Sequence, residues 1–200
     1  MLLISVRLTL WQPLHSLQHH RRMTRRILEW GEARKFRGNT TPYAQCMKYI
    51  EEFAEFQSAF AIDDHDEMED ALGDMYVVAC MCYLSMISDK PKFEYEQAKG
   101  LAEELEIEIG KALLATSPER YTVAMVGAEK FITDTVQLIA ANRKQPVMTR
   151  IACRKLIAIP AIIADMVGID FDECCYKAYK AIEHRKGEWQ GGVFVKESDL

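Results

Sequence analysis

Apolar residues recur at helical spacing along most of this chain. One aromatic stripe has intervals of four, three and four residues, which places its members on one face of a helix. It consists of Tyr49, Phe53, Phe56 and Phe60. Thr41 and Pro42 precede it in the order of an N-cap and a first helical residue. From about Glu67, a second segment continues past Asp74 as a nearly unbroken apolar run, which predicts a helix buried on all sides. The pattern therefore predicts an all-α protein built as a helical bundle.

The rest of the chain predicts further helices. Residues 23–38 read as one amphipathic helix, and residues 93–115 and 122–143 as two more. A last helix follows a Gly-Ile-Asp turn, with Asp170 or Asp172 as its N-cap. The connector between the first two helices offers three acids that could cap the second one, namely Asp63, Asp64 and Asp66.

Acidic residues lie beside the apolar ones on the two helices around the connector. They recur three or four residues apart on each helix, so they share a face. The acids are Glu51, Glu52 and Glu55 on the first helix and Asp70 and Asp74 on the second, and the amine of Lys48 lies on the same side of the first helix. If the helices pack antiparallel, at least four carboxylates come together, and such oxygen donors suit Mg²⁺ or Mn²⁺. Because uncompensated buried charge is costly, the acids either face water or are neutralised by a cation. The apolar residues in the same turns favour the metal site over a solvated acidic face.

This arrangement resembles the MazG-like all-α nucleoside triphosphate pyrophosphohydrolases, and the phage-type members in particular. The EExxE element of that family is intact as Glu51, Glu52 and Glu55. The second element, ExxD, is altered, because Asp74 matches but the acid lies at Asp70, as in the similar DxxGD arrangement of phage-type members. The C-terminal segment, with Arg185-Lys186-Gly187 followed by GVFVKE, is also similar to phage-type members.

The resemblance covers roughly residues 23–87 and 157–200 and implies a domain organisation. Residues 23–200 would form a helical bundle of the all-α NTP pyrophosphohydrolase type, with a helical insertion at about 88–156. Residues 1–22 would be an N-terminal extension. Members of the family are commonly dimers or tetramers, so we expect a homodimer or homotetramer.

The resemblance also implies the chemistry. A (deoxy)nucleoside triphosphate would be hydrolysed between the α and β phosphates, with Mg²⁺ or Mn²⁺ as cofactor. The metal ligands would be Glu52, Glu55, Asp70 and Asp74. The catalytic residues would be Glu51 or Glu52, which orients or deprotonates the attacking water, and Lys48. The substrate-binding residues would be Trp30, Arg34, Gln45, Arg185, Lys186 and Lys196. Core packing is an equal alternative for Trp30. The lysine and asparagine that relatives often carry before the C-terminal arginine are replaced here by Glu183 and His184.

Composition and charge bear on which binding partners and which cellular compartment we expect. A net charge of −5 among 200 residues does not favour stable binding of nucleic acid. No apolar run approaches the length of a membrane span, so we expect no membrane partner. The six cysteines include no zinc-like CxxC pair, and without a convincing secretory signal they predict reduced thiols in the cytoplasm, or the host cytoplasm if the protein is phage-encoded.

Two other functions fit an acidic helical bundle. A ferritin-like di-iron protein would need Glu-x-x-His motifs, and neither acidic helix has a histidine at that offset. A non-catalytic oligomerisation or partner-binding module would carry the same acids merely as a solvated surface. The agreement of both ends of the chain with one family favours the hydrolase.

Overall fold

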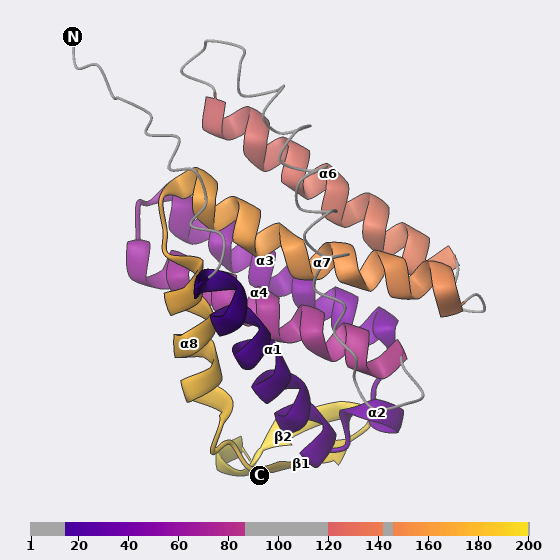
Figure 1. Ribbon diagram of the computed structural model, residues 1–200. Helices are drawn as coiled ribbons and strands as arrows, with labels where there is room; N and C mark the ends of the chain where they lie inside the picture. The colour runs from indigo at the N-terminus through magenta and orange to yellow at the C-terminus, as the bar shows by residue number, and fades with distance from the viewer. Residues whose placement is uncertain (1–14, 87–119, 142–145, 200) are drawn as a thin grey trace, which may run out of the picture.

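The computed structural model describes residues 15–86, 120–141 and 146–199 and is almost entirely helical (Figure 1). The helices are α1 (His15–Ala33), α2 (Phe36–Asn39), α3 (Pro42–Ala61), α4 (His65–Met86), α6 (Arg120–Ala141), α7 (Pro146–Val167) and α8 (Phe171–Ile182). A hairpin of β1 (Gly187–Gln190) and β2 (Val193–Lys196) and a short 3₁₀ turn, η1 (Glu197–Asp199), follow α8. The prediction of an all-α fold is confirmed, with this hairpin as a small addition.

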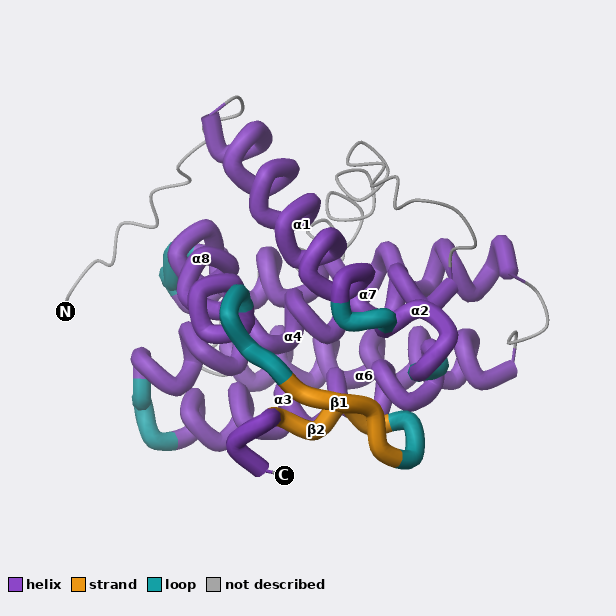
Figure 2. Tube along the Cα trace, turned by 90° about the horizontal axis from the view of Figure 1, so that it is seen from below, coloured by secondary structure: helices purple, strands orange, loops and turns teal. Residues whose placement is uncertain are grey.

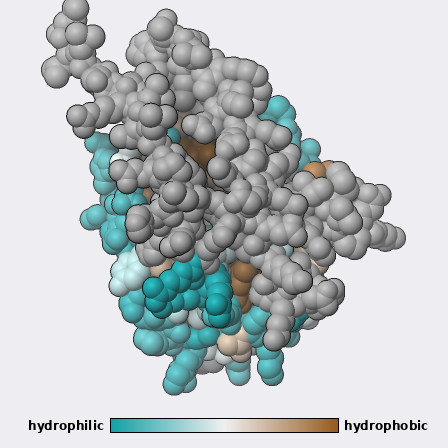
Figure 3. Space-filling model, viewed as in Figure 1, coloured by the Kyte–Doolittle hydropathy of each residue, from teal (hydrophilic) through white to brown (hydrophobic). Residues whose placement is uncertain are grey.

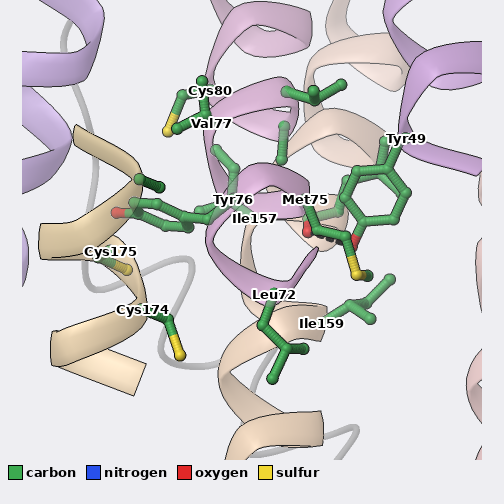
Figure 4. Close-up of a cluster of buried hydrophobic side chains, with 14 of the residues drawn as sticks. Tyr49, Leu72, Met75, Tyr76, Val77, Cys80, Ile157, Ile159, Cys174 and Cys175 are labelled. Carbon is green, nitrogen blue, oxygen red and sulfur yellow. Dashed lines mark hydrogen bonds between the residues drawn. The ribbon is translucent and has the colours of Figure 1, made fainter. Parts of the chain in front are cut away.

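Helix α4 forms the centre of the molecule. Its residues from Met75 to Leu84 are all buried, as the apolar run predicted, and it packs against α1, α2, α3, α7 and α8. Figure 4 shows side chains of four helices meeting there. They include Tyr49 of α3, Leu72 and Tyr76 of α4, Ile157 of α7 and Cys175 of α8. The Tyr49 hydroxyl donates a hydrogen bond of 3.0 Å to the Leu156 carbonyl, which satisfies a polar group that is otherwise fully buried.

The helix starts follow the predicted capping residues. Thr41 accepts a hydrogen bond from the Ala44 amide at 3.1 Å, and Pro42 is the first residue of α3. Of the three acids in the connector, Asp64 accepts from the Glu67 amide at 3.2 Å. At α8 the N-cap is Asp170, whose carboxylate accepts from the amides of Asp172 and Glu173. Each cap satisfies amides that the first turn of a helix leaves without partners.

The first helix differs from the prediction at both ends. Helix α1 begins at His15, so the expected boundary between residues 22 and 23 falls inside one continuous helix. It ends at Ala33 because Lys35 adopts a left-handed conformation with φ of 58°. The turn directs Phe36 back onto Trp30, with ring centroids 5.3 Å apart. Burial of that ring offsets the backbone cost that ends the helix before residue 38.

The C-terminal hairpin was not predicted. Its strands pair antiparallel, with Trp189 opposite Phe194 and a two-residue turn of Gly191 and Gly192. Both glycines have positive φ, as a type I′ hairpin turn requires. A Gly-Gly pair between short runs that contain aromatic and β-branched residues is the sequence signal that could have identified it. The hairpin lies beside α2 at one end of the bundle (Figure 2).

Helices α6 and α7 lie side by side and antiparallel, and α7 packs directly on α4 (Figure 1). The predicted helix at 122–143 is confirmed as α6. Helix α7 runs through residue 156, where the proposed insertion would end, and its buried residues include Leu156, Ile159 and Ile163. The expected end of the insertion is therefore no element boundary. The predicted helix at 93–115 lies outside the described residues.

On the face shown in Figure 3, the described residues along α1 and at the hairpin end are mostly hydrophilic. None of the helices that the structure describes combines the length and apolar character needed to cross a bilayer.

Candidate functional site

Helices α3 and α4 pack against each other and place their acids in one environment. The Lys48 ammonium lies 2.9 Å from Glu52 Oε1 and 3.1 Å from Glu51 Oε2. With 4 % of its surface exposed, Glu52 is the one buried charged residue among the side chains that the structure describes. Such a group needs a partner, and Lys48, one turn earlier on the same helix, supplies it.

Burial and like charge both act on Glu52. Burial is the larger cause, and together with the nearby charges of Asp74 and Glu55 it raises the pKa of Glu52 to about 7, against the opposing effect of Lys48. Burial alone would lower the pKa of Lys48, but its hydrogen bonds to Glu52 and Glu51 outweigh this and raise it. Lys48 is therefore cationic at neutral pH, whereas the pKa of Glu52 lies close to neutral pH.

Asp74 is the corresponding acid on α4. Burial and the neighbouring charge of Asp70 raise the pKa of Asp74 to about 6, while Arg185 and Lys48 act in the opposite direction. Arg185 follows α8, so three separate segments of the chain contribute charge to one place. The other three expected metal ligands, Lys48 and Arg185 are therefore all within electrostatic range of Asp74.

We refer to Glu52, Glu55, Asp70 and Asp74 as the acidic cluster. Its donor chemistry fits Mg²⁺ or Mn²⁺. Its donors are carboxylate oxygens, which hard divalent cations prefer. A cation would offset the cost of burial and the like-charge repulsion that raise the pKa values of Glu52 and Asp74. In the parts of the chain that the structure describes, however, no three His, Cys, Asp or Glu side chains already surround one point as metal ligands. The carboxylate of Glu52 is turned to Lys48 instead. Ligation by the expected set therefore requires some of these side chains to rotate.

Trp30 lies in the core. It is 7 % exposed and packs against Phe36 and Phe194, with ring centroids 5.3 and 6.3 Å away. The Arg34 guanidinium lies over its ring, 4.7 Å from the centroid. The structure therefore favours core packing for Trp30, which was the alternative to base stacking.

Arg34 is engaged by backbone carbonyls. Its Nε donates to the Arg185 carbonyl at 2.7 Å, and two further nitrogens donate to the carbonyls of Glu183 and Trp30 at 3.3 and 3.4 Å. Contacts on three sides place this side chain between α1 and the end of α8. All three of its guanidinium nitrogens therefore already donate to backbone carbonyls.

The other expected substrate-binding residues lie around the same end of the molecule. Gln45 donates a hydrogen bond of 3.0 Å to the Thr40 hydroxyl. Lys186 and Lys196 are exposed at the open end of the hairpin, where Lys196 is opposite Gly187. Among the three expected C-terminal cations, Arg185 is the one whose charge acts on Asp74.

Two features near the site were not anticipated. The Trp189 indole N–H donates to the Arg34 carbonyl at 2.7 Å, which ties the hairpin to the end of α1. Glu183 stands where MazG-like proteins often carry a lysine. Its carboxylate pairs with the Lys180 ammonium, and its Oε1 lies 3.3 Å from His184 Nε2. The Trp189 contact joins residues 155 positions apart and depends on the missed hairpin, so local spacing carried no signal for it. The Glu183 contacts, in contrast, are local, because Lys180 lies three residues before Glu183 and His184 directly after it.

The described cysteines are free thiols, as predicted. They are Cys46, Cys80, Cys82, Cys174 and Cys175, and all are buried. Burial raises the pKa of Cys174 to about 12, so this thiol is protonated and a poor nucleophile. These thiols therefore act as small core residues.

No family model matches this chain, and no curated protein and no solved structure matches it either. The MazG-like resemblance consequently rests on the residues of the chain itself.

Proposed function

We propose that this protein hydrolyses a nucleoside or deoxynucleoside triphosphate to the monophosphate and pyrophosphate, using Mg²⁺ or Mn²⁺. The observation that carries the proposal is the convergence of the acidic cluster with Lys48 and Arg185. Two of the acids, Glu52 and Asp74, are largely withdrawn from water beside like charges, which is an arrangement that costs stability. Such costly charge clusters are concentrated at functional sites.

The acids would divide the work between binding and catalysis. Glu52, Glu55, Asp70 and Asp74 would hold the cation, which supplies charge neutralisation for the phosphate oxygens. Glu51 is exposed beside Lys48 and would orient or deprotonate the attacking water, with Glu52 as the alternative. Water adds across the α–β phosphoanhydride bond, and the proton it loses passes to the carboxylate.

The cations would face the departing group. Lys48 stands on the α3 side of the acids and Arg185 beyond the end of α8, so a polyphosphate lying between them meets positive charge from two directions. Lys186 and Lys196 are exposed nearby and would add to the attraction of the anionic substrate.

The first test is pyrophosphate release from each common NTP and dNTP, with Mg²⁺, Mn²⁺ or EDTA. We expect metal-dependent release from one or a few of them. Glu55→Gln and Asp74→Asn are each expected to lower kcat at least about a hundredfold, because each removes a charged ligand without changing side-chain size. Far-UV circular dichroism should show the same helix content in both variants.

Glu67→Gln is the matched control, since Glu67 is an exposed acid in the first turn of α4 and is not a member of the cluster. It should retain activity. Metal-dependent release that survives both Glu55→Gln and Asp74→Asn would refute the assignment of the site. No release from any nucleotide by the folded protein would refute the activity on common nucleotides.

A non-catalytic oligomerisation module is the second candidate. It is supported by a stripe on α3 formed by Tyr43, Met47 and Ile50, which are 55, 42 and 37 % exposed. Their spacing of four and three residues is that of a helix–helix seam. A second copy of the chain, as in the expected homodimer or homotetramer, would cover this stripe in either candidate function.

The buried free thiols support the cytoplasmic location proposed from the sequence.

A further inference from the structure

The C-terminal ends of two helices meet at Arg34. Helix ends leave carbonyl groups without partners and carry partial negative charge. The guanidinium donates to the carbonyl of Trp30 near the end of α1 and to that of Glu183, the C-cap of α8. It also donates to the carbonyl of Arg185 at 2.7 Å. One cation therefore satisfies carbonyls from both helix ends and from the segment that follows α8.

The contact is reciprocal. The carbonyl of Arg34 accepts a hydrogen bond of 2.7 Å from the indole N–H of Trp189. The hairpin is therefore bonded to the same residue whose side chain binds the segment that precedes the hairpin. Trp189 also packs on Phe36, with ring centroids 4.9 Å apart, and Phe36 packs on Trp30. We refer to the side chains of Arg34 and Trp189, together with the backbone carbonyls that accept their hydrogen bonds, as the clasp. These carbonyls belong to Trp30, Arg34, Glu183 and Arg185. Both ends of the three-residue segment from Glu183 to Arg185, and the strand after it, are tied to α1 by the clasp.

Arg185 is the residue whose position the clasp determines. Its amide donates to the Ile182 carbonyl at 2.8 Å and its carbonyl accepts from Arg34, so its backbone is held on both sides. Its positive charge lowers the pKa of both Asp74 and Arg34, so its guanidinium is within electrostatic range of the acidic cluster and of the clasp. The two like charges repel each other, and the carbonyls bound by Arg34 offset that repulsion.

We propose that Arg34 is a positioning residue that holds Arg185 against the acidic cluster through the Glu183 and Arg185 carbonyls, so that Arg185 binds the pyrophosphate portion of the substrate. This inference rests on the function proposed above. It replaces the direct substrate contact expected for Arg34. Lysine cannot replace it fully, because a single ammonium group lacks the planar fork that reaches several carbonyls at once while covering the Trp30 ring.

The test is a double-mutant cycle between Arg34 and Arg185, read by isothermal titration of inorganic pyrophosphate in the presence of Mg²⁺. Arg185→Met should weaken pyrophosphate binding about tenfold, the usual effect of losing one charge-assisted hydrogen bond. Arg34→Met should weaken it by a similar factor. Because Arg34 acts through Arg185, the double variant should be no more than about twofold weaker than either single variant.

Arg34→Lys should fall between wild type and Arg34→Met. Trp189→Phe keeps an aromatic ring and loses only the indole donor, so it supplies a milder perturbation of the clasp if Arg34→Met fails to fold. It should weaken pyrophosphate binding in the wild-type background and have no further effect beside Arg185→Met. Arg25→Met is the matched control on α1, since Arg25 is exposed and bonded to Glu29. It should bind pyrophosphate like wild type.

Additive effects of Arg34→Met and Arg185→Met would overturn the inference, because they would mean that Arg34 contacts the ligand itself. Unchanged binding in Arg34→Met would overturn it as well. The activity and the clasp can fail separately. If pyrophosphate binds and the cycle is non-additive while no nucleotide is hydrolysed, the proposed activity is wrong and the clasp stands. If nucleotides are hydrolysed and the cycle is additive, the clasp is wrong and the activity stands.

Discussion

At the scale of single residues, Glu52 shows how a sequence motif becomes a physical device. Its place in the EExxE pattern leads to a carboxyl group with almost no exposed surface, next to Asp74 and Glu55. Lys48, at the preceding turn, is the cation that makes this burial tolerable. The spacing of four residues on one helix is local, so this pair could be predicted from the sequence.

The pKa values of Glu52 and Asp74 predict the pH dependence of stability without metal. In the folded protein they are raised to about 7 and about 6, above the ordinary values near 4 of the unfolded chain. Deprotonation then favours the unfolded state, so these two groups stabilise the fold below about pH 4 and lose that contribution as the pH rises through about 7. The combined effect is on the order of a few kcal/mol.

Urea unfolding in EDTA at several pH values across this window measures the effect. The free energy of unfolding should decline with rising pH, and the decline should be smaller in the Glu52→Gln, Asp74→Asn double variant. That variant has no carboxylates to deprotonate at these positions. An equal decline in wild type and variant would contradict the prediction and assign the pH dependence to other groups.

At the scale of elements, the contact of α4 with α8 depends on Gly73, the residue before Asp74. A Cβ at this position would lie 2.6 Å from the Cys174 carbonyl oxygen and 2.8 Å from the Ala178 Cβ. Neither is the free end of a flexible side chain, so Gly73→Ala must move one helix away from the other. We expect it to lower the free energy of unfolding by about 1–3 kcal/mol, as overpacking does. The shift would also displace Asp74 and reduce turnover.

Gly127→Ala on α6 is the matched comparison. A Cβ there meets nothing within 4 Å, and the residue is exposed. It should raise the free energy of unfolding by about 0.5–1 kcal/mol, because alanine restricts the unfolded chain and favours the helix. Chemical denaturation of both variants gives the comparison. Equal effects of the two substitutions would show that the α4–α8 contact is not as close as described.

At the scale of the whole molecule, the exposed stripe of Tyr43, Met47 and Ile50 predicts self-association. Apolar side chains at helix-seam spacing on an outer helix gain free energy when a second copy covers them. Met47→Glu should convert the expected dimer or tetramer to a smaller species, since it places a charge inside the seam. Sedimentation velocity over a range of protein concentrations measures this.

Val126→Glu is the control, because Val126 is an exposed apolar residue on a different helix, α6. Its sedimentation should match wild type. A wild-type protein that remains monomeric at all concentrations would contradict both the stripe as an interface and the oligomer expected from the family resemblance.

The sequence by itself determined where α3, α4 and α8 begin and how charge is grouped along α3 and α4. The side-chain caps at Thr41, Asp64 and Asp170 act within three residues of themselves, and the spacing within the EExxE element lies within one helical turn. Only the tertiary structure decided that α1 ends at a left-handed Lys35, that the C-terminal hairpin packs against the end of α1, and that Arg34 binds backbone carbonyls after α8. Those outcomes depend on contacts between residues about 150 positions apart. Their geometry follows from how helices pack, and no local period in the sequence specifies that packing.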